Sequence, residues 1–315
     1  MLEIVINLPD TFTRRISESF EEAGPAWLND LPNLVASLER EWSIQAAPHF
    51  PDLSYNYVAP ATTADGTQVV LKLGVPGREA RSEIAALELA GGRGYVQLLK
   101  ADPQRGAMLL ERLVPGRELV ELTDEDEAIG IAAAVMRRIW QLPPPGHSFP
   151  TVADWARGME RLRAEFEGGS GPFPPALVDE AERLFAELIP TMAEPVVLHG
   201  DLHHYNILSA TREPWLAIDP KGIIGEPACE VFAFLRNPLG RHGRGNRKFG
   251  IDSRPDLIQL LAHRLNGFAS ELGLDPERLR QWGIAQSVLS AGWSYEDHRA
   301  GWEPDIKIAE ALSTL

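Results

Sequence analysis

Apolar residues near the start of the chain recur at the spacing of an amphipathic helix. Over residues 16–42 they fall close to every 3.6 positions, and Gly24-Pro25 interrupts them. The apolar positions are Ile16, Phe20, Trp27, Leu31, Leu34, Leu38 and Trp42. We therefore expect helical structure over this region, with a break at Gly24-Pro25.

From residue 53 the pattern changes to short runs that are bounded by turn residues. Asp65-Gly66 is a hairpin signal, and Gly91-Gly92 ends a helical run. The expected elements, in order, are strands 53–58 and 68–73, a helix over 78–90, and strands 96–100 and 107–110. This order predicts a mostly antiparallel sheet with one helix packed on it.

After the connector Pro115-Gly116, helical patterns dominate the chain. Asp124 with Glu127 is an N-cap pair for the first of these helices, which the three prolines from residue 143 terminate. Two further helical patterns follow, over residues 155–166 and 177–188.

Two short strand-like runs, 195–198 and 215–218, interrupt the helical pattern, which returns from about residue 228. The fold class expected is therefore α+β. A small, sheet-rich lobe would cover residues 1–112, and a larger, mainly helical lobe would cover residues 113–315. Ligands tend to bind between such lobes.

Composition narrows the class of protein. The chain has 315 residues, of which 44% are hydrophobic and 24% are charged, as in a typical globular protein. Because no apolar run approaches the roughly 20 residues that span a bilayer, we expect no membrane association. The single cysteine, Cys229, excludes an intrachain disulfide and a multi-cysteine metal site. The acidic start is unlike a signal peptide, so we expect a cytoplasmic protein; nothing in the sequence indicates its oligomeric state.

Acidic residues outnumber basic ones by 45 to 30, which gives a formal net charge of −15. Such a chain repels nucleic acid, so we expect no nucleic-acid partner. The charge can serve solubility alone. It can also reflect acidic residues that line a site for a cationic small molecule.

The segment HGDLHHYNIL, which begins at His199, carries the strongest chemical signal. Asp201 is followed after four residues by Asn206, and Asp219 comes about a dozen residues later. Phosphoryl transfer from ATP needs a carboxylate that accepts the proton of the attacking hydroxyl and oxygen ligands that hold Mg²⁺ on the phosphates. Asp201 fits the first role, and Asn206 and Asp219 fit the second.

This segment, followed by IDP, resembles the catalytic loop and metal-binding aspartate of the aminoglycoside phosphotransferase family, which has the protein-kinase-like bilobal fold. Protein kinases have H-R-D-x-x-x-x-N and D-F-G in these places, whereas this chain has Gly200 and Pro220 where they have Arg and Phe. The stretch IDPKGIIGEPACEVFAFLRNP is similar to the streptomycin 6-kinase and hydroxyurea-kinase-like branch. Glu230 stands where that branch usually has Asp.

The resemblance implies further nucleotide-binding residues. Lys72 would contact the α- and β-phosphates of ATP, and a helix glutamate would hold it. We favour Glu83 for that role because of its spacing to the following leucines, and Glu79 is the alternative. Residues 109–113 resemble the linker that binds adenine through its backbone, including Glu111 and Leu113. The chain has no glycine-rich phosphate motif, so residues 53–57 would cover the phosphates.

Plainer interpretations remain for these residues. Asp201 and Asn206 could be ordinary turn residues, and Lys72 could be a strand lysine with an exposed amine. His199 and His203 are four residues apart, which would suit zinc, but zinc needs three or four ligands. We interpret His199 as structural.

The acceptor site is the least defined part of the prediction. We name four acidic residues that could bind a cationic acceptor: Glu226, Glu230, Glu296 and Asp297. Trp293 and Trp302 lie near the last two and could instead be core residues. Lys221 could approach the phosphates or pair with Glu226. The role of the basic, glycine-rich loop over residues 241–248 stays open.

The function expected is an ATP- and Mg²⁺-dependent phosphotransferase that acts on a hydroxyl of a small molecule, such as a streptomycin-like aminoglycoside. A kinase of hydroxyurea-like compounds or of another metabolite is the alternative within this class. Outside it stand a nucleotide-binding protein without catalysis and a metal-dependent hydrolase that uses the histidines. The sequence leaves open the acceptor, the hydroxyl that is modified, the choice between ATP and GTP, and any role in resistance.

Overall fold

The computed structural model describes residues 6–238 and 250–315, so the basic loop over 241–248 lies outside the described residues. The chain divides into two compact units, Met1–Gly116 (unit 1) and Arg117–Leu315 (unit 2). The division follows residue 116, whereas the sequence pattern predicted it after residue 112. Strands dominate the first unit and helices the second, and the predicted α+β class is confirmed.

Unit 1 contains a five-stranded sheet in the order β1-β2-β3-β5-β4, in which each neighbouring pair is antiparallel. The elements of unit 1 are α1 (Asp10–Ser19), α2 (Ala23–Trp42), β1 (Ile44–Ala46), β2 (Tyr57–Thr63), β3 (Gln68–Leu73), α3 (Arg78–Ala90), β4 (Leu98–Asp102) and β5 (Ala107–Glu111). The helix over 78–90 and the strand over 68–73 are confirmed at the expected bounds.

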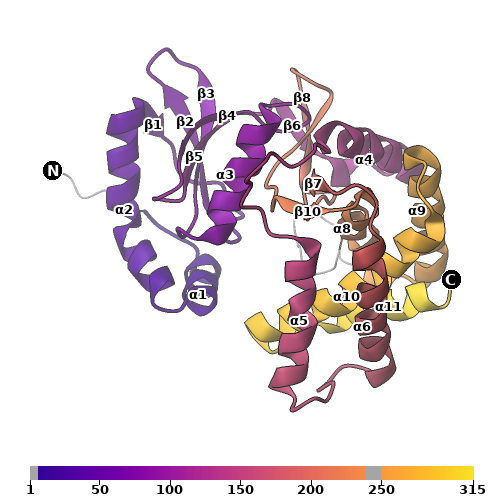
Figure 1. The fold of residues 1–315 in the computed structure, drawn as a ribbon. Coiled ribbons are helices and arrows are strands. Elements are labelled where there is room, and N and C mark those ends of the chain that lie inside the picture. Colours follow the sequence, from indigo (N-terminus) through magenta and orange to yellow (C-terminus); the bar gives the residue numbers. More distant parts are fainter. Residues whose placement is uncertain (1–5, 239–249) are drawn as a thin grey trace. The chain divides into compact units, whose positions relative to one another are not determined.

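The two faces of this sheet are covered by different helices (Figure 1). Val69, Leu71 and Leu73 of β3 pack into one buried cluster with Phe12 of α1 and Leu31 of α2. Side chains alternate along a strand, so Lys72 between them points to the opposite face. That face carries α3, and the pattern of β3 therefore directs a buried lysine toward this helix.

Two expectations for unit 1 are wrong in detail. The helical break was expected at Gly24-Pro25, but it lies between α1 and α2 at residues 20–22. Gly24 and Pro25 are the second and third residues of α2. Proline is tolerated in a first turn, where backbone N–H groups have no intrahelical partner. A Cβ on Gly24 would lie 2.3 Å from the carbonyl oxygen of Ile16, so this glycine allows α1 and α2 to approach closely.

The strand expected over residues 53–58 begins only at Tyr57. The residues before it belong to the connection between β1 and β2, in which the N–H of Phe50 donates to the carbonyl of Val58 in β2. Ser54 and Asn56 favour turns over ladder pairing, which explains the shorter strand.

Unit 2 is mainly helical, and short strands hold its central loops. The helices are α4 (Glu125–Ile139), α5 (Val152–Glu165), α6 (Pro175–Leu188), α7 (Pro227–Glu230), α8 (Phe232–Arg236), α9 (Leu257–Leu272), α10 (Pro276–His298) and α11 (Glu303–Ser313). The strands are β7 (Val196–Leu198), β8 (Ile207–Ala210), β9 (Trp215–Ala217) and β10 (Ile223–Gly225), and β6 (Pro115–Glu118) lies at the division between the units. Single 3-10 turns occur at Leu119–Glu121, Ile189–Thr191 and Ile251–Ser253. Asp124 caps α4 as expected, accepting from the N–H groups of Asp126 and Glu127.

The strand β7 pairs antiparallel with β10, and β8 lies between β6 and β9 in a three-stranded sheet in which β8 and β9 are antiparallel. The sequence pattern predicted β7 and β9 but not their partners, β10 and β8. The helix α10 is buried on all sides from Trp282 to Gly292 and contacts α5, α6, α7, α8, α9 and α11 (Figure 1). A helix without a single apolar stripe is typical of a protein interior.

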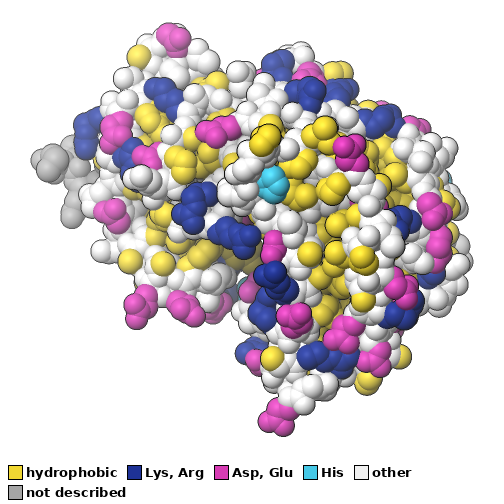
Figure 2. Space-filling view, viewed as in Figure 1, with side chains coloured by type: hydrophobic (Ala, Val, Ile, Leu, Met, Phe, Trp, Pro, Cys, Tyr) yellow, Lys and Arg dark blue, Asp and Glu magenta, His cyan; other side chains and the backbone are white. Residues whose placement is uncertain are grey.

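Charged side chains of both signs are interspersed over the face shown in Figure 2. Many charged side chains of the described residues form ion pairs, as Arg163 does with Asp179 and Glu182. Within the described residues, no helix is both long enough and apolar enough to span a membrane.

Arg264 of α9 binds the C-terminal end of the short helix α8. Its side chain is 1% exposed, and its guanidinium donates to the carbonyl oxygens of Phe234, Leu235 and Asn237 at 2.6–2.9 Å. It also pairs with Glu125 at 2.5 Å. The last carbonyls of a helix lack intrahelical donors, so Arg264 satisfies groups that would otherwise be buried without a partner.

We expect Arg264→Met to lower the free energy of unfolding by about 3 kcal/mol, because it leaves three carbonyls and Glu125 without their donor. Urea unfolding followed by tryptophan fluorescence measures this loss. Arg183→Met, at a half-exposed arginine on α6 that pairs with Glu180 and Glu187, is the control and should cost less than about 1 kcal/mol. Equal losses in the two variants would contradict the role of Arg264.

Candidate functional site

The segment from His199 to Asn206, called the catalytic loop below, connects β7 to β8. His199 fixes its start. The imidazole is fully buried, and its Nε2 lies 2.7 Å from the carbonyl oxygen of Ile218, while Nδ1 lies 3.2 Å from the backbone N of Asp201. A neutral ring with the proton on Nε2 satisfies both contacts. Burial lowers the pKa of His199 to about 4, so the ring is neutral near pH 7 and serves as a structural link, as expected from the sequence.

The antiparallel pairing of β8 with β9 brings Asn206 next to Asp219. Ile207 pairs with Ala217, and the N–H of Ile218 donates to the carbonyl of Asn206 at 3.0 Å. Asp219 follows directly. Its backbone has φ +59°, a left-handed conformation that non-glycine residues seldom adopt outside helix ends and turns. The carboxylate of Asp219 is thus set in a constrained bend beside the end of the catalytic loop.

Asn206 and Asp201 are fixed to each other. The Nδ2 of Asn206 donates to the backbone carbonyl of Asp201 at 3.0 Å, which turns the amide oxygen Oδ1 away from that bond. No described residue donates to this oxygen. The carboxylate of Asp201 is 40% exposed and lies 3.7 Å from the ring of His203. The structure therefore brings together the three residues that the sequence singled out in unit 2: Asp201, Asn206 and Asp219.

These oxygens fit the requirements of Mg²⁺ on a nucleotide. The described residues contain no cluster of three or more His, Cys, Asp or Glu side chains that could bind a metal by themselves. Mg²⁺ in kinase sites usually has one or two protein ligands, with phosphate and water oxygens completing the octahedron. One carboxylate from Asp219 and one amide oxygen from Asn206 supply such a set.

Glu230 of α7 supports the catalytic loop from the interior. Its carboxylate is 1% exposed and accepts from the N–H groups of His199 and Gly200 at 2.7 and 2.8 Å. Burial raises the pKa of Glu230 to about 7, and the two N–H donors oppose that shift. The substrate role named for Glu230 is therefore not retained, because both carboxylate oxygens bond the backbone of the loop.

Glu226 is likewise committed to the interior. It is 2% exposed, pairs with Arg278 at 2.6 Å and accepts from the indole of Trp282, all in contact with α10. Its other oxygen accepts from the N–H of Ala193 at 3.2 Å. These bonds join the start of α7 to α10, so Glu226 is not retained as a substrate residue either.

Glu296 and Asp297 lie on the exposed end of α10. Glu296 pairs with Arg161 at 3.1 Å, and neither residue lines the pocket described next. Trp302 packs against Phe173, with ring centroids 5.3 Å apart. The acidic group expected around a cationic acceptor is therefore not assembled by these four residues in the structure.

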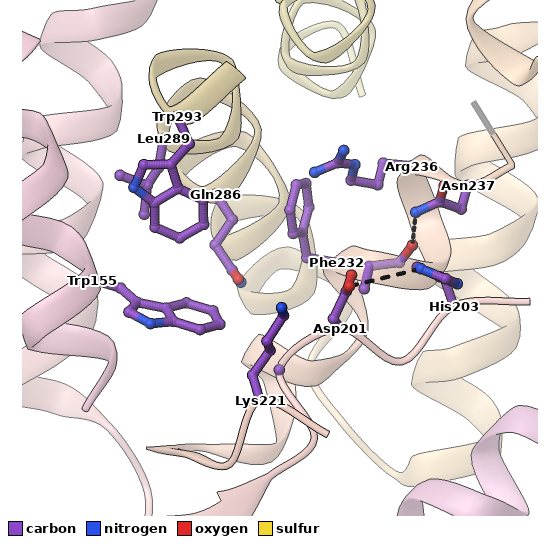
Figure 3. A pocket seen from close by; sticks show the side chains of 12 residues that line it. Trp155, Asp201, His203, Lys221, Phe232, Arg236, Asn237, Gln286, Leu289 and Trp293 are labelled. Carbon is purple, nitrogen blue, oxygen red and sulfur yellow. Dashed lines mark hydrogen bonds and ion pairs between the residues drawn. The ribbon is translucent and has the colours of Figure 1, made fainter. Parts of the chain in front are cut away.

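A pocket of about 230 Å³ opens beside Asp201 within unit 2 (Figure 3). Trp155 of α5 and Trp293 of α10 form one wall, with their rings edge to face at 5.3 Å. Lys221 extends between Trp155 and Asp201 in Figure 3. The lining residues are Trp155, Gly200, Asp201, His203, Lys221, Phe232, Ala233, Arg236, Asn237, Gln286, Leu289 and Trp293.

Most of these lining residues were missed by the sequence analysis. Trp155 was interpreted only as a helix position, and Gln286 drew no attention. These residues can be recognised as pocket residues only in the structure, since α5, α8 and α10 are far apart in sequence. Arg236 and Asn237 belong to the LRNP run, which is part of the stretch that resembles the family. That run was a signal in the sequence that could have identified both residues as pocket residues.

The nucleotide residues expected in the first lobe belong to unit 1. Lys72 and Glu83 form a buried ion pair, with exposed fractions of 2% and 6%. The structure thus joins Lys72 to the glutamate favoured over Glu79. Glu111 ends β5, and its side chain accepts from the N–H of Gln97 at 3.1 Å. Leu113 is buried just after it.

Comparison with known proteins agrees with this geometry. The family model described as aminoglycoside/hydroxyurea antibiotic resistance kinase matches residues 41–298. A streptomycin 6-kinase of Streptomyces griseus is 33% identical over 311 residues, which cover 98% of this chain and 97% of that protein. A hydroxyurea phosphotransferase of Kitasatospora aureofaciens is 33% identical over 300 residues, or 92% of this chain and 81% of that protein.

Among solved structures, the choline kinase LicA from Streptococcus pneumoniae has a similar fold. Its TM-score is 0.62 at 12% identity, and the match covers 91% of this chain and 100% of that one. At that identity the likeness shows the fold alone, which is the protein-kinase-like fold expected from the motifs. The family match over residues 41–298 and the relatives that are 33% identical over more than nine-tenths of this chain together show that the chain belongs to the aminoglycoside/hydroxyurea antibiotic resistance kinase family.

Proposed function

We propose that this chain transfers the γ-phosphate of ATP, with Mg²⁺, to a hydroxyl of an aminoglycoside of the streptomycin kind. The observation that carries the proposal is the meeting of Asp201, Asn206 and Asp219 beside a pocket of small-molecule size. Family membership supports the phosphotransfer chemistry, and the printed activity of the Streptomyces griseus relative supports the acceptor.

Asp201 is the proposed base. Its carboxylate is partly exposed and borders the pocket, while its backbone N–H and C=O are held by His199 and Asn206. An acceptor hydroxyl within hydrogen-bond reach of this carboxylate can pass its proton to Asp201 as the bond to phosphorus forms. Holding the two reacting groups in line supplies much of the rate.

Asn206 and Asp219 are the proposed ligands of Mg²⁺, which would neutralise charge on the phosphate oxygens when bound. Lys72 is proposed to steady the α- and β-phosphates, with Glu83 holding its ammonium in place. Because Lys72 belongs to unit 1 and the other three residues to unit 2, their use of one nucleotide is part of the proposal. Dependence on ATP fits a cytoplasmic enzyme.

A second acceptor class has its own support. The Kitasatospora aureofaciens relative is a hydroxyurea phosphotransferase of similar identity, and the pocket wall of Trp155 and Trp293 carries no carboxylate that would select a polycation. An assay of ADP release with streptomycin, hydroxyurea and other hydroxylated acceptors separates the two. Transfer to hydroxyurea without transfer to streptomycin would overturn the aminoglycoside assignment and leave the phosphotransferase assignment intact.

We expect Asp201→Asn to lower kcat by about 10²- to 10⁴-fold, because the amide cannot accept the hydroxyl proton. The dissociation constant for MgATP, measured by calorimetry, should stay within about threefold, since general-base loss acts on the chemical step. Asp179→Asn, at an exposed aspartate on α6, is the matched control and should keep full activity. Turnover by Asp201→Asn close to that of the control would remove the base assignment.

We expect Asp219→Ala to weaken MgATP binding by about tenfold or more, because it removes the carboxylate ligand of the metal. The loss should depend on magnesium, so that calorimetry with EDTA gives similar ATP affinities for the variant and the wild type. Glu310→Ala, at an exposed acid on α11, controls for charge. An affinity loss of equal size with and without magnesium would argue against a metal role.

A further inference from the structure

Lys221 places a cation in the pocket that holds Asp201. It follows Asp219 by two residues, and its backbone N–H donates to the carbonyl of His199 at 2.7 Å. The same histidine binds Ile218 through its ring. The backbone of Lys221 is therefore fixed in register with both the proposed base and the proposed metal ligand, and its side chain lines the pocket (Figure 3).

Gly200 shows how closely this lysine approaches the catalytic loop. Gly200 has φ +82°, and a Cβ there would lie 2.8 Å from Ile223, 3.0 Å from Trp155 and 3.3 Å from the Cβ of Lys221. A left-handed glycine without a side chain lets Lys221 start directly against the residue before Asp201. The lysine stem is thus packed between the loop and the tryptophan wall.

The second basic side chain that lines the pocket, Arg236, pairs with a carboxylate outside the pocket lining. Arg236 lies 3.2 Å from Asp305 and donates to Ser290, and Asp305 is 1% exposed. Asp305 thus balances the charge of Arg236. Asp201 is the one carboxylate among the pocket residues, and Lys221 extends into the pocket beside it (Figure 3).

Phosphoryl transfer brings negative charge to this place. If Asp201 takes the hydroxyl proton, the acceptor oxygen lies within about 3 Å of its carboxylate, and the phosphorus lies within about 3–3.5 Å of that oxygen at attack. The transferred group carries its charge on three equatorial oxygens. A carboxylate so close repels them, so a fixed cation at the same place stabilises the transition state.

We propose that Lys221 is a catalytic residue that binds an equatorial oxygen of the phosphoryl group during transfer. The bond between the acceptor oxygen and the γ-phosphorus forms, and the bond between that phosphorus and the β,γ-bridging oxygen breaks. ADP leaves with the electron pair, and the hydroxyl proton passes to Asp201. Lys221 keeps its own protons and donates one hydrogen bond. Protein kinases have D-F-G at the position of Asp219-Pro220, and Lys221 takes the place of its glycine. The inference rests on the proposed function.

Lys221→Met, which keeps the length of the stem and removes the charge, tests the proposal. We expect kcat to fall by about 10²-fold or more with the acceptor KM within about threefold, because a transition-state contact is lost. Lys221→Arg should recover at least tenfold of the loss. Lys307→Met, at an exposed lysine on α11, is the matched control and should behave as the wild type.

A binding measurement separates this role from a structural one. Tetrafluoroaluminate with MgADP and acceptor mimics the planar phosphoryl group, and transition-state mimics bind more tightly than substrates. Calorimetry should show that tetrafluoroaluminate raises the MgADP affinity of the wild type and of Lys307→Met but not of Lys221→Met. MgADP alone should bind all three equally, which also verifies that Lys221→Met is folded.

Two outcomes would overturn the proposal. A raised acceptor KM with unchanged kcat in Lys221→Met would make this lysine an acceptor ligand. An undiminished response to tetrafluoroaluminate in that variant would remove the phosphoryl contact. A wild type that binds no MgADP would instead contradict the proposed function itself, so the two failures are distinguishable.

Discussion

The buried carboxylate of Glu230 is the constraint on which the chemistry of unit 2 depends. Bringing an acid into the interior is costly, and the pKa of about 7 reflects that cost. The carboxylate persists there because two backbone N–H groups of the catalytic loop, at His199 and Gly200, donate to it. The loop is therefore held by its main chain, which leaves the side chains of Asp201 and His203 to line the pocket.

His199 extends this arrangement from one strand pair to the other. Its backbone directly follows β7, while its ring contacts the carbonyl oxygen of Ile218 just before Asp219. A shift of either strand pair would have to break a buried hydrogen bond, and a buried polar group without a partner costs about 1–3 kcal/mol. The distances among Asp201, Asn206 and Asp219 are set by these bonds and not by the loop alone.

Sequence reasoning was strongest where chemistry and local pattern coincide. Lys72 lies in a run with strand period and Glu83 on the helix that follows, and the family resemblance implied that they pair, as they do. Motif spacing likewise located Asp201, Asn206 and Asp219. Motif spacing did not give the roles of Glu226 and Glu230, because the sequence pattern around an acidic residue is the same whether its side chain faces a ligand or the interior. Only burial and partners separate the two cases.

The pocket wall was beyond the reach of sequence patterns for a related reason. Trp155 follows a helical period that predicts a core position, and it does contact another ring, that of Trp293. Which part of the core is hollow depends on how α5, α8 and α10 pack. Packing of distant helices follows from side-chain volumes over the whole unit and not from the period of any one segment.

The crowding around Gly200 also bears on how such an enzyme can be controlled. Protein kinases carry arginine at this position of the motif, and phosphorylated activation loops are ordered through arginine–phosphate pairs. Here Trp155, Ile223 and Lys221 occupy the space that the first atom of any side chain would need. An arginine therefore does not fit at this position, so the loop cannot be switched through an arginine–phosphate pair there. Buried hydrogen bonds from His199 and Glu230 hold the loop in place instead.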